Sequence, residues 1–472
     1  MTSTIATAPH RLPLLGHFVP LLRDPAGFVA SLPAYGDLVR IGMGPITAVM
    51  VCDPQLTQQV LRHDRVFDKG GPVFDRAREA IGDGLGTCPY SRHRRLRRLM
   101  QPAFHPSRIA EYASVMSQRI IEIAESWRDG QIIDVRAQMK TLTLQVTTAT
   151  LFAHSVPEPS LRRIFRDVDT VVDGVMRRAI MPGPLLRLPI LGNRAYWPAI
   201  TRLRAVIGQV IAERRAADIH PPDLLSAVVD ARDTDGGGLS DPEIVDQILT
   251  LFVAGTETTA SALQWALYLL DENPDLAARL RIELDTVLAG RPARYDDLPQ
   301  LPLTGRIITE TLRVRSPFWL ATRTVTEDTE LGGHPLAKGA IVAYSPYLLH
   351  HRADLYPEPD RFDPDRWDPA VATPAQRSAL IPFSDGARKC IGDTFAVTEA
   401  VLALATIATR WELRGVPAQD TSPALSSILR PRKLRMRVTA RHAPAVSCAV
   451  SDLEVLGTSP TPGRGTGSDN DQ

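Results

Sequence analysis

The chain of 472 residues has few cysteines and no long apolar run. Its four cysteines, Cys52, Cys88, Cys390 and Cys448, show no spacing typical of a disulfide framework or a zinc site. The apolar stretch from Leu12 to Leu22 is far shorter than the roughly 20 residues that span a bilayer. Near the start there is neither a basic segment followed by an apolar run nor a cleavage site. We therefore expect a reduced, cytoplasmic protein without a membrane anchor.

The chain also lacks an excess of charge of either sign. Its 54 Lys and Arg residues against 53 Asp and Glu give a formal net charge of +1, which argues against a nucleic-acid-binding protein. The basic run from His93 to Arg98 has no aromatic residues between its charges, so it is not typical of a nucleic-acid patch either. Hydrophobic residues make up 44% of the chain, which is enough for a sizeable core.

Short β-like runs precede a long helical region. Leu38 to Ile41 and Ala48 to Cys52 have the composition of strands, whereas helical patterns dominate from Arg92 to Leu312. The sequence therefore predicts a mainly α fold with a small β region near the N-terminus.

Three segments have the composition of loops or tails. Residues 181–198 are rich in proline and glycine, and residues 230–238 contain a run of Asp, Thr and Gly, so both are predicted to be surface loops. Residues 441–472 are too poor in apolar side chains to pack. We expect one catalytic domain over residues 1–440 and a disordered tail after it.

The segment Phe383-Ser-Asp-Gly-Ala-Arg-Lys-Cys-Ile-Gly392 carries the strongest chemical signal. A cysteine thiolate is a strong electron donor to haem iron, and Cys390 is the candidate ligand. Gly386 can take a positive φ, and Gly392 leaves room for a flat macrocycle close to the backbone. An isolated cysteine is more often a small buried apolar residue. The neighbours of Cys390 are what favour the metal-ligand interpretation.

An apolar, helix-forming run begins at Ile391, directly after this cysteine. We therefore expect Cys390 at a helix N-terminus, where backbone N–H groups lower the pKa of a thiol. Arg388 lies two residues before the ligand and is predicted to reach a haem propionate.

A second segment lies in the middle of a long predicted helix. Ser240 and Glu243 form a capping box that starts the helix, which is expected to run to about Leu270. Its middle reads Ala254-Gly255-Thr256-Glu257-Thr258-Thr259, where two small residues allow close approach of a cofactor. Thr258 can bond back to the carbonyl four residues earlier. Taken alone, the segment is more typical of an ordinary buried helix.

Together these segments resemble the cytochrome P450 family, whose haem loop has the pattern Phe-x-x-Gly-x-Arg-x-Cys-x-Gly. The resemblance covers roughly residues 10–440 and implies the triangular, mainly α fold of that family, with haem b held by Cys390. It places Ala254 and Gly255 over the distal face of the haem. It also implies that Glu257 and Thr258 deliver protons during oxygen activation.

The resemblance assigns further residues to the cofactor and to a structural network. His93 and Arg97, four residues apart before Pro-Ala-Phe, and Arg323 after a short extended run are implied to bind the propionates. Glu310 and Arg313, on a predicted helical run from Arg306 to Leu312, make an i, i+3 pair that alone means little. In the family this pair joins an arginine of a Pro-Glu-Arg-Phe-like segment, which we match to Arg361.

The substrate is predicted only by class. By family position the distal pocket is lined by mostly apolar residues: Phe74, Ile248, Phe252, Phe318, Trp319, Leu320 and Ile428. Residues 68–72 and 86–95 also resemble bacterial P450s that oxidise sesquiterpene hydrocarbons, pentalenene oxygenases among them. An apolar lining is typical of most pockets, so a fatty acid, a steroid or a polyketide stays open.

The resemblance implies a monooxygenase of secondary metabolism that hydroxylates an apolar molecule in one or more steps. Electrons would come from NAD(P)H through a ferredoxin and its reductase. Arg94, Arg95, Arg98 and Lys389 are candidates for the docking face, although a solvated charge run is equally expected. A haem-thiolate enzyme that needs no external electrons and a haem sensor are the alternatives. Glu257 and Thr258 argue against both of them.

Overall fold

The computed structural model describes residues 4–44, 46–153, 158–181, 193–217, 221–424 and 428–441. Contacts between residues divide the chain into two units, Met1–Arg441 and His442–Gln472. The second unit lies outside the described residues, so the disorder predicted for the tail stays a prediction. All that follows concerns the first unit.

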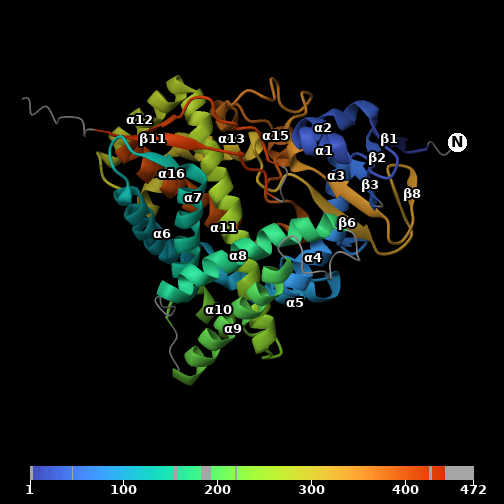
Figure 1. Cartoon of the computed structure of the whole chain (residues 1–472), viewed down its shortest axis with the longest axis horizontal. Helices are drawn as coiled ribbons and strands as arrows, with labels where there is room; N and C mark the ends of the chain where they lie inside the picture. Colours follow the sequence, from blue (N-terminus) through green and yellow to red (C-terminus); the bar gives the residue numbers. More distant parts are fainter. Residues whose placement is uncertain are drawn as a thin grey trace, which may run out of the picture. The chain divides into compact units, whose positions relative to one another are not determined.

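Helices form most of the first unit, which confirms the mainly α prediction (Figure 1). The longer helices are α4 Pro72–Ile81, α5 Tyr90–Met100, α6 Pro106–Ser126, α7 Val135–Phe152, α8 Glu158–Ile180, α9 Asn193–Ala217, α11 Asp241–Glu272, α12 Pro274–Leu288, α13 Pro302–Val314 and α16 Asp393–Arg410. The shorter ones are α1 Phe18–Arg23, α2 Pro25–Ser31, α3 Pro54–Arg62, α10 Leu224–Val229, α14 Pro346–His350 and α15 Pro374–Ala379.

Helix α11 organises the helical part. It packs against α7, α9, α13 and α16, and α16 packs in turn against α6 (Figure 1). The predicted capping box is confirmed, since the side chain of Glu243 accepts from the backbone N–H of Ser240. The helix ends at Glu272, two residues beyond the predicted end, with Asn273 and Pro274 after it. Nineteen of its side chains are buried, because α11 is enclosed by other helices on several sides.

A six-stranded sheet joins the beginning of the chain to its later part. Its strand order is β1-β2-β3-β9-β6-β4. The strands are β1 Ala6–Thr7, β2 Leu38–Met43, β3 Ile46–Val51, β4 Phe67–Lys69, β6 Ala321–Val325 and β9 Ile341–Tyr344. Strands β2 and β3 confirm the predicted β-like runs. Figure 1 shows the early strands beside those from residues 321–344.

Two smaller sheets complete the strands of the described residues. One has the order β10-β11-β5, and the other is the pair β7-β8. Their strands are β5 Ile132–Asp134, β7 Thr329–Leu331, β8 His334–Leu336, β10 Trp411–Gly415 and β11 Arg435–Ala440. Buried apolar side chains form a large core between the helices and a second one beneath the first sheet.

The predicted loops had different outcomes. Residues 230–238 lie between α10 and α11, as predicted. Most of the segment 181–198 falls outside the described residues, but its last part is helical because α9 begins at Asn193 and contains Pro198. The prediction of a loop reaching residue 198 is therefore wrong at its end.

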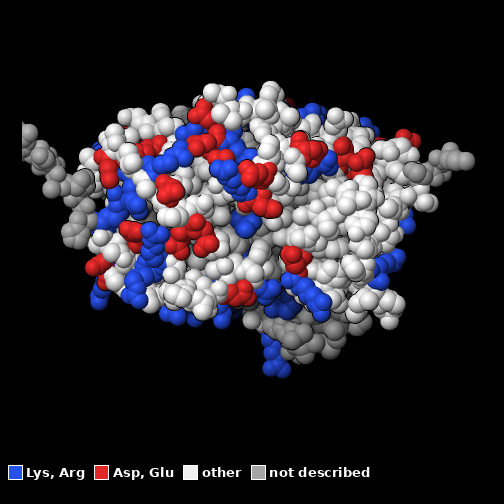
Figure 2. All heavy atoms as spheres, turned by 90° about the horizontal axis from the view of Figure 1, so that it is seen from above, with Lys and Arg blue, Asp and Glu red and all other residues white. Residues whose placement is uncertain are grey.

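The surface carries charges of both signs. Figure 2 shows Lys and Arg interspersed with Asp and Glu over one end of the face in view, beside a broad area with few charged side chains. No helix among the described residues is long and apolar enough to cross a membrane.

Candidate functional site

The cysteine loop has a fixed backbone shape. Gly386 has φ +69°, and a Cβ built there would lie 2.5 Å from the carbonyl oxygen of Leu61. Only glycine fits this position, for reasons of both conformation and space. The backbone N–H of Cys390 donates to the carbonyl of Phe383 at 2.9 Å and closes the loop. The predicted positive φ of Gly386 is thus confirmed.

The thiol of Cys390 stands just before helix α16. The helix begins at Asp393 with Gly392 as its N-cap, so the predicted helix terminus is confirmed. The backbone N–H of Gly392 lowers the pKa of the thiol, but desolvation by the surrounding protein is larger and raises it overall. The predicted lowering by a backbone N–H at the helix end is thus confirmed, but burial outweighs it. Solvent still reaches the residue, and it forms no disulfide.

Arg388 is held by three groups of the protein itself. Its Nε donates to Asp64 at 3.0 Å, and one terminal nitrogen donates to Asp68 at 2.6 Å. The other terminal nitrogen donates to the carbonyl of Cys88 at 2.9 Å. Since two carboxylates balance its charge and its side chain is buried, Arg388 ties the cysteine loop to residues 64–88. Its predicted contact with a propionate stays a prediction.

The other predicted propionate residues gather near the loop. His93 and Arg97 lie on α5, and the guanidinium of Arg97 donates to the carbonyl of Lys389 at 2.5 Å. Arg323 lies on β6 and is 2% exposed. Burial, and after it the positive charges of Arg388, Lys69 and Arg97, lower the pKa of His93 to about 3. The imidazole is therefore neutral at neutral pH, beside these basic side chains.

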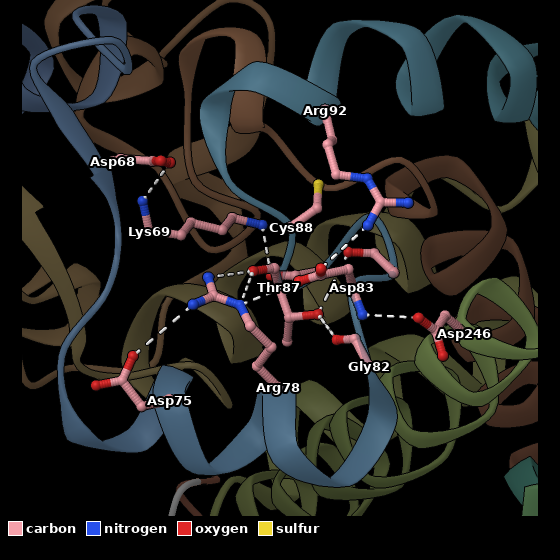
Figure 3. Close-up of polar contacts among 12 residues, drawn as sticks. Asp68, Lys69, Asp75, Arg78, Gly82, Asp83, Thr87, Cys88, Arg92 and Asp246 are labelled. Atoms are coloured by element: carbon pink, nitrogen blue, oxygen red, sulfur yellow. Dashed lines mark hydrogen bonds and ion pairs between the residues drawn. The ribbon is translucent and has the colours of Figure 1, made fainter. Parts of the chain in front are cut away.

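Sequence reasoning missed Lys69. It lies on β4 directly opposite Arg323 in the antiparallel pairing of β4 and β6. Its ammonium donates to the carbonyl of Gly86 at 2.8 Å, and Figure 3 shows it directed toward the loop that carries Thr87 and Cys88. Burial lowers its pKa to about 7, with Arg323 and then Arg388 acting in the same direction. Sequence patterns could not indicate this role of Lys69, because Arg323 is 254 positions away in the chain.

This cluster fits a dianionic macrocycle. Like charges opposite one another on paired strands repel, and buried cations need anions. Among the described residues, the guanidinium of Arg323 bonds to the carbonyl of Thr322 and the hydroxyl of Tyr344 but to no carboxylate, and its buried Nε has no hydrogen-bond partner. At Gly392 an added Cβ would touch only Phe104, at 3.7 Å, so the protein itself does not require glycine there. These features match a haem whose propionates meet the cations and whose iron binds Cys390.

The loop opposite the cations is braced by an arginine. In Figure 3, the guanidinium of Arg78 holds the carbonyl of Thr87, at 2.7 Å for the shorter contact. The backbone N–H of Asp83 donates to Asp246 of α11 at 2.8 Å. The loop of residues 82–88 is therefore fixed between α4 and α11.

The middle of α11 has the predicted features. The hydroxyl of Thr258 donates to the carbonyl of Ala254 at 2.7 Å, which confirms the predicted back-bond. Ala254 is exposed although it lies midway along α11, and Gly255 approaches Thr147 of α7. Glu257 is 12% exposed and paired with a lysine. An alcohol and an acid thus stand side by side on α11, and their role in proton delivery stays a prediction.

The Glu310–Arg313 pair is confirmed, but its predicted third member is wrong. Both side chains are fully buried on α13 and joined by a bidentate contact of 2.7 and 2.9 Å. The side chain of Arg361 is 63% exposed and pairs with Glu358, so that only the backbone carbonyl of Arg361 reaches Arg313. Arg366, 9% exposed, approaches Glu310 at 3.4 Å instead.

The sequence contained the signal for Arg366. The segments Pro359-Asp-Arg-Phe362 and Pro364-Asp-Arg-Trp367 have the same pattern, and the prediction used the first one. The second lies in a 3-10 helix packed on α13, and the indole of Trp367 donates to Glu310 at 2.8 Å.

The predicted pocket residues fall into two groups. Ile248, Phe252 and Trp319 are 0%, 3% and 3% exposed, so they are buried in the protein core. This corrects their assignment to an open pocket lining. The others are partly exposed and stay predictions: Phe74, Phe318, Leu320 and Ile428.

The outward arginines of α5 divide in the same way. Arg94 and Arg98 are exposed, as is Lys389. Arg95 instead donates to the carbonyl of Gly238 at 2.7 Å and pairs with Glu243, which removes it from the predicted docking face.

A comparison with protein families decides the identity of the site. Residues 7–437 match the family model of cytochrome P450. The chain belongs to the cytochrome P450 family. It is 44% identical to the pentalenene oxygenase of Streptomyces avermitilis, over 93% of this chain and 98% of that protein. It is 46% identical to the cyclooctatin synthase of Streptomyces melanosporofaciens, over 91% and 94% of the two chains.

A third relative is the cyclooctat-9-en-7-ol 5-monooxygenase of Streptomyces melanosporofaciens, 42% identical over 88% of this chain and 90% of that protein. The P450 described here is a monooxygenase, and its cofactor is haem b with a cysteine thiolate ligand. The predicted family, fold and cofactor are confirmed. The reaction requires O2, an apolar substrate and a redox partner.

Proposed function

We propose that this P450 hydroxylates a cyclic terpene hydrocarbon in bacterial secondary metabolism. One observation carries the proposal: three relatives that align with nearly the whole chain at 42–46% identity are named for oxidation within such pathways, pentalenene oxygenase among them. The partly exposed pocket candidates Phe74, Phe318, Leu320 and Ile428 are apolar, which supports an uncharged substrate.

Haem bound through Cys390 supplies the chemistry that cleaves O2 and inserts one oxygen atom into a C–H bond, with two electrons and two protons consumed. The loop geometry around Gly386 holds the thiolate in place. In this proposal the hydroxyl of Thr258, which follows Glu257 on α11, orients water. Glu257 takes protons from water and gives them up again. The pocket orients the hydrocarbon and so sets which carbon reacts.

Electrons come, in this proposal, from a ferredoxin and its reductase in the cytoplasm. Arg94 and Arg98 are both exposed. They are four residues apart on α5, about one helical turn, and so lie on the same face. Lys389 is exposed next to the ligand Cys390. These three cations support docking of an acidic electron donor near the cysteine loop.

The test starts with binding to the purified ferric holoenzyme. Pentalenene, a second sesquiterpene hydrocarbon, palmitate and a steroid are titrated while the Soret spectrum is recorded. A low-to-high-spin shift with a terpene, followed by hydroxylated product when ferredoxin, reductase and NADPH are added, supports the proposal. A shift and product with palmitate or the steroid alone would overturn it.

Omission of the redox partners separates the alternatives. A monooxygenase forms no product without them, whereas an enzyme that rearranges its substrate would continue. A haem sensor would form no product under either condition.

A further inference from the structure

One face of α7 contacts the acid and alcohol segment of α11. Lys140, Thr143 and Thr147 are spaced i, i+3 and i+7, so they share that face. The hydroxyl of Thr143 donates to the carbonyl of Thr256 at 2.9 Å. A Cβ added to Gly255 would lie 3.2 Å from the hydroxyl oxygen of Thr147, which shows how closely the two helices approach. Helix α7 therefore braces residues 255–257.

Lys140 is the charged member of this face. Its Nζ lies 2.5 Å from Oε1 of Glu257 and also contacts the carboxylate of Asp169 on α8. The side chain of Lys140 is 16% exposed, and those of Glu257 and Asp169 are 12% and 48% exposed. The three residues thus lead from the interior toward solvent, and α8 passes in front of the lower part of α11 in Figure 1. Solvent screens such a shielded pair less than a surface pair.

We propose that Lys140 positions the Glu257 carboxylate for proton delivery, and that Asp169 is the alternative partner that allows Glu257 to be released. The inference rests on the proposed function, in which Glu257 moves protons. Two carboxylates share one ammonium, so Glu257 can leave Lys140 while Asp169 keeps that charge balanced. Released, Glu257 takes a proton from water, gives it up beside Thr258 and returns as a carboxylate.

Other charges face this group and enter its pH dependence. They are Asp173 on α8, Arg136 on α7 and Arg430, which directly follows Leu429. The carbonyl of Leu429 accepts from Ser261 and Trp265 of α11, so this segment is held against the same helix. Burial raises the pKa of Asp169, with Glu257 and Asp173 acting in the same direction and Lys140 opposing them. Asp169 therefore takes up a proton at a higher pH than an ordinary aspartate.

The experiment replaces the ammonium without changing the length of the side chain greatly. Purified Lys140→Met holoenzyme is assayed with ferredoxin, reductase and NADPH, with and without pentalenene as the probe hydrocarbon. We expect unchanged haem content and thiolate spectrum, several-fold more hydrogen peroxide per NADPH, and a larger solvent isotope effect on NADPH oxidation. The isotope effect does not depend on whether pentalenene is the natural substrate.

Matched variants separate positioning from folding. Lys140→Arg keeps the charge and should restore coupling, whereas Lys338→Met makes the same chemical change at an exposed site and should leave coupling unchanged. Asp169→Asn removes the alternative partner, so Glu257 stays bound to Lys140 and turnover falls without a comparable increase in peroxide. A shift of the pH profile in Asp169→Asn supports the same arrangement.

The outcomes distinguish this inference from the function on which it rests. If Glu257→Gln uncouples the enzyme while Lys140→Met behaves as wild type in coupling and isotope effect, the role of Lys140 is overturned and that of Glu257 stands. If Glu257→Gln is itself fully coupled, the proposed proton delivery fails. Loss of the thiolate spectrum in both Lys140 variants would also overturn the inference, because it would assign Lys140 a purely structural role.

Discussion

Lys69 and Arg323 lie directly opposite each other on β4 and β6, so two cations occupy neighbouring positions at the edge of the haem site. Cross-strand pairs of like charge are destabilising unless an anion lies between or beside them. The pairing therefore predicts that both residues bind the carboxylates of the cofactor.

Lys69→Met should release haem faster than the wild type. We expect a rate about tenfold higher, which corresponds to about 1.4 kcal/mol of lost binding. The measurement follows loss of the Soret band when excess apomyoglobin is added as a haem acceptor. Lys69→Arg should stay close to wild type, and equal release by Lys69→Met would contradict a role at the propionates.

Gly386→Ala should destabilise the cysteine loop. The new Cβ meets both a positive φ and the carbonyl of Leu61, and we expect a loss of more than about 2 kcal/mol in the free energy of unfolding. Gly290 also has a positive φ, of +84°, but no atom within 4 Å of an added Cβ. Gly290→Ala therefore isolates the conformational part, about 1–2 kcal/mol. Similar urea midpoints for the two variants would show that the clash is relieved by movement of the loop.

Arg366→Leu should be far more damaging than Arg361→Leu. Removal of Arg366 leaves the buried Glu310 with one fewer cation, and breaking such a pair costs about 3–5 kcal/mol. Arg361→Leu changes an exposed side chain and should stay within about 0.5 kcal/mol of wild type. Urea unfolding of the holoenzymes, followed by tryptophan fluorescence, compares the two. The reverse order would restore Arg361 to the network.

His351 should make stability depend on pH. Burial lowers its pKa from 6.5 to about 4. Below pH 6.5 the unfolded chain therefore binds a proton that the folded protein does not, and stability falls as the pH drops toward 4. The full effect is about 3 kcal/mol.

His351→Phe is the matched variant for this effect. It keeps a ring stacked on Tyr347, whose ring centroid lies 3.9 Å from that of His351, and removes the titration. Its Tm should fall less than that of wild type between pH 6.5 and 4, whereas the lowered pKa of the neighbouring buried His350 contributes in both proteins. Parallel Tm curves would contradict the lowered pKa of His351.

Short contiguous patterns allowed the sequence to predict much of the site. The cysteine loop, the Ser240–Glu243 capping box and the back-bond of Thr258 each depend on residues within ten positions of one another, so local rules suffice. The effect of the backbone N–H on the pKa of Cys390 was predicted, but the larger effect of burial was not, because it depends on how much protein surrounds the thiol.

The missed residues act across the fold. The partners of Lys69 and Lys140 lie on other strands and helices, and no local pattern assigned either residue its role. Arg361 and Arg366 stand in equivalent patterns five positions apart, and only packing on α13 separates them. The loop predicted up to Pro198 failed at its end because a helix can contain proline near its start. Helix α9 begins at Asn193 and includes Pro198.

The contacts of Arg388 also determine when the protein can acquire its cofactor. The bond from Arg388 to Asp64 joins residues 324 positions apart, so the loop is locked only after the two ends of the catalytic unit have met. During synthesis the loop leaves the ribosome long after the early strands. The haem site is therefore assembled only after residues 64–388 have been made, and a chain truncated before Phe383 would lack the ligand Cys390.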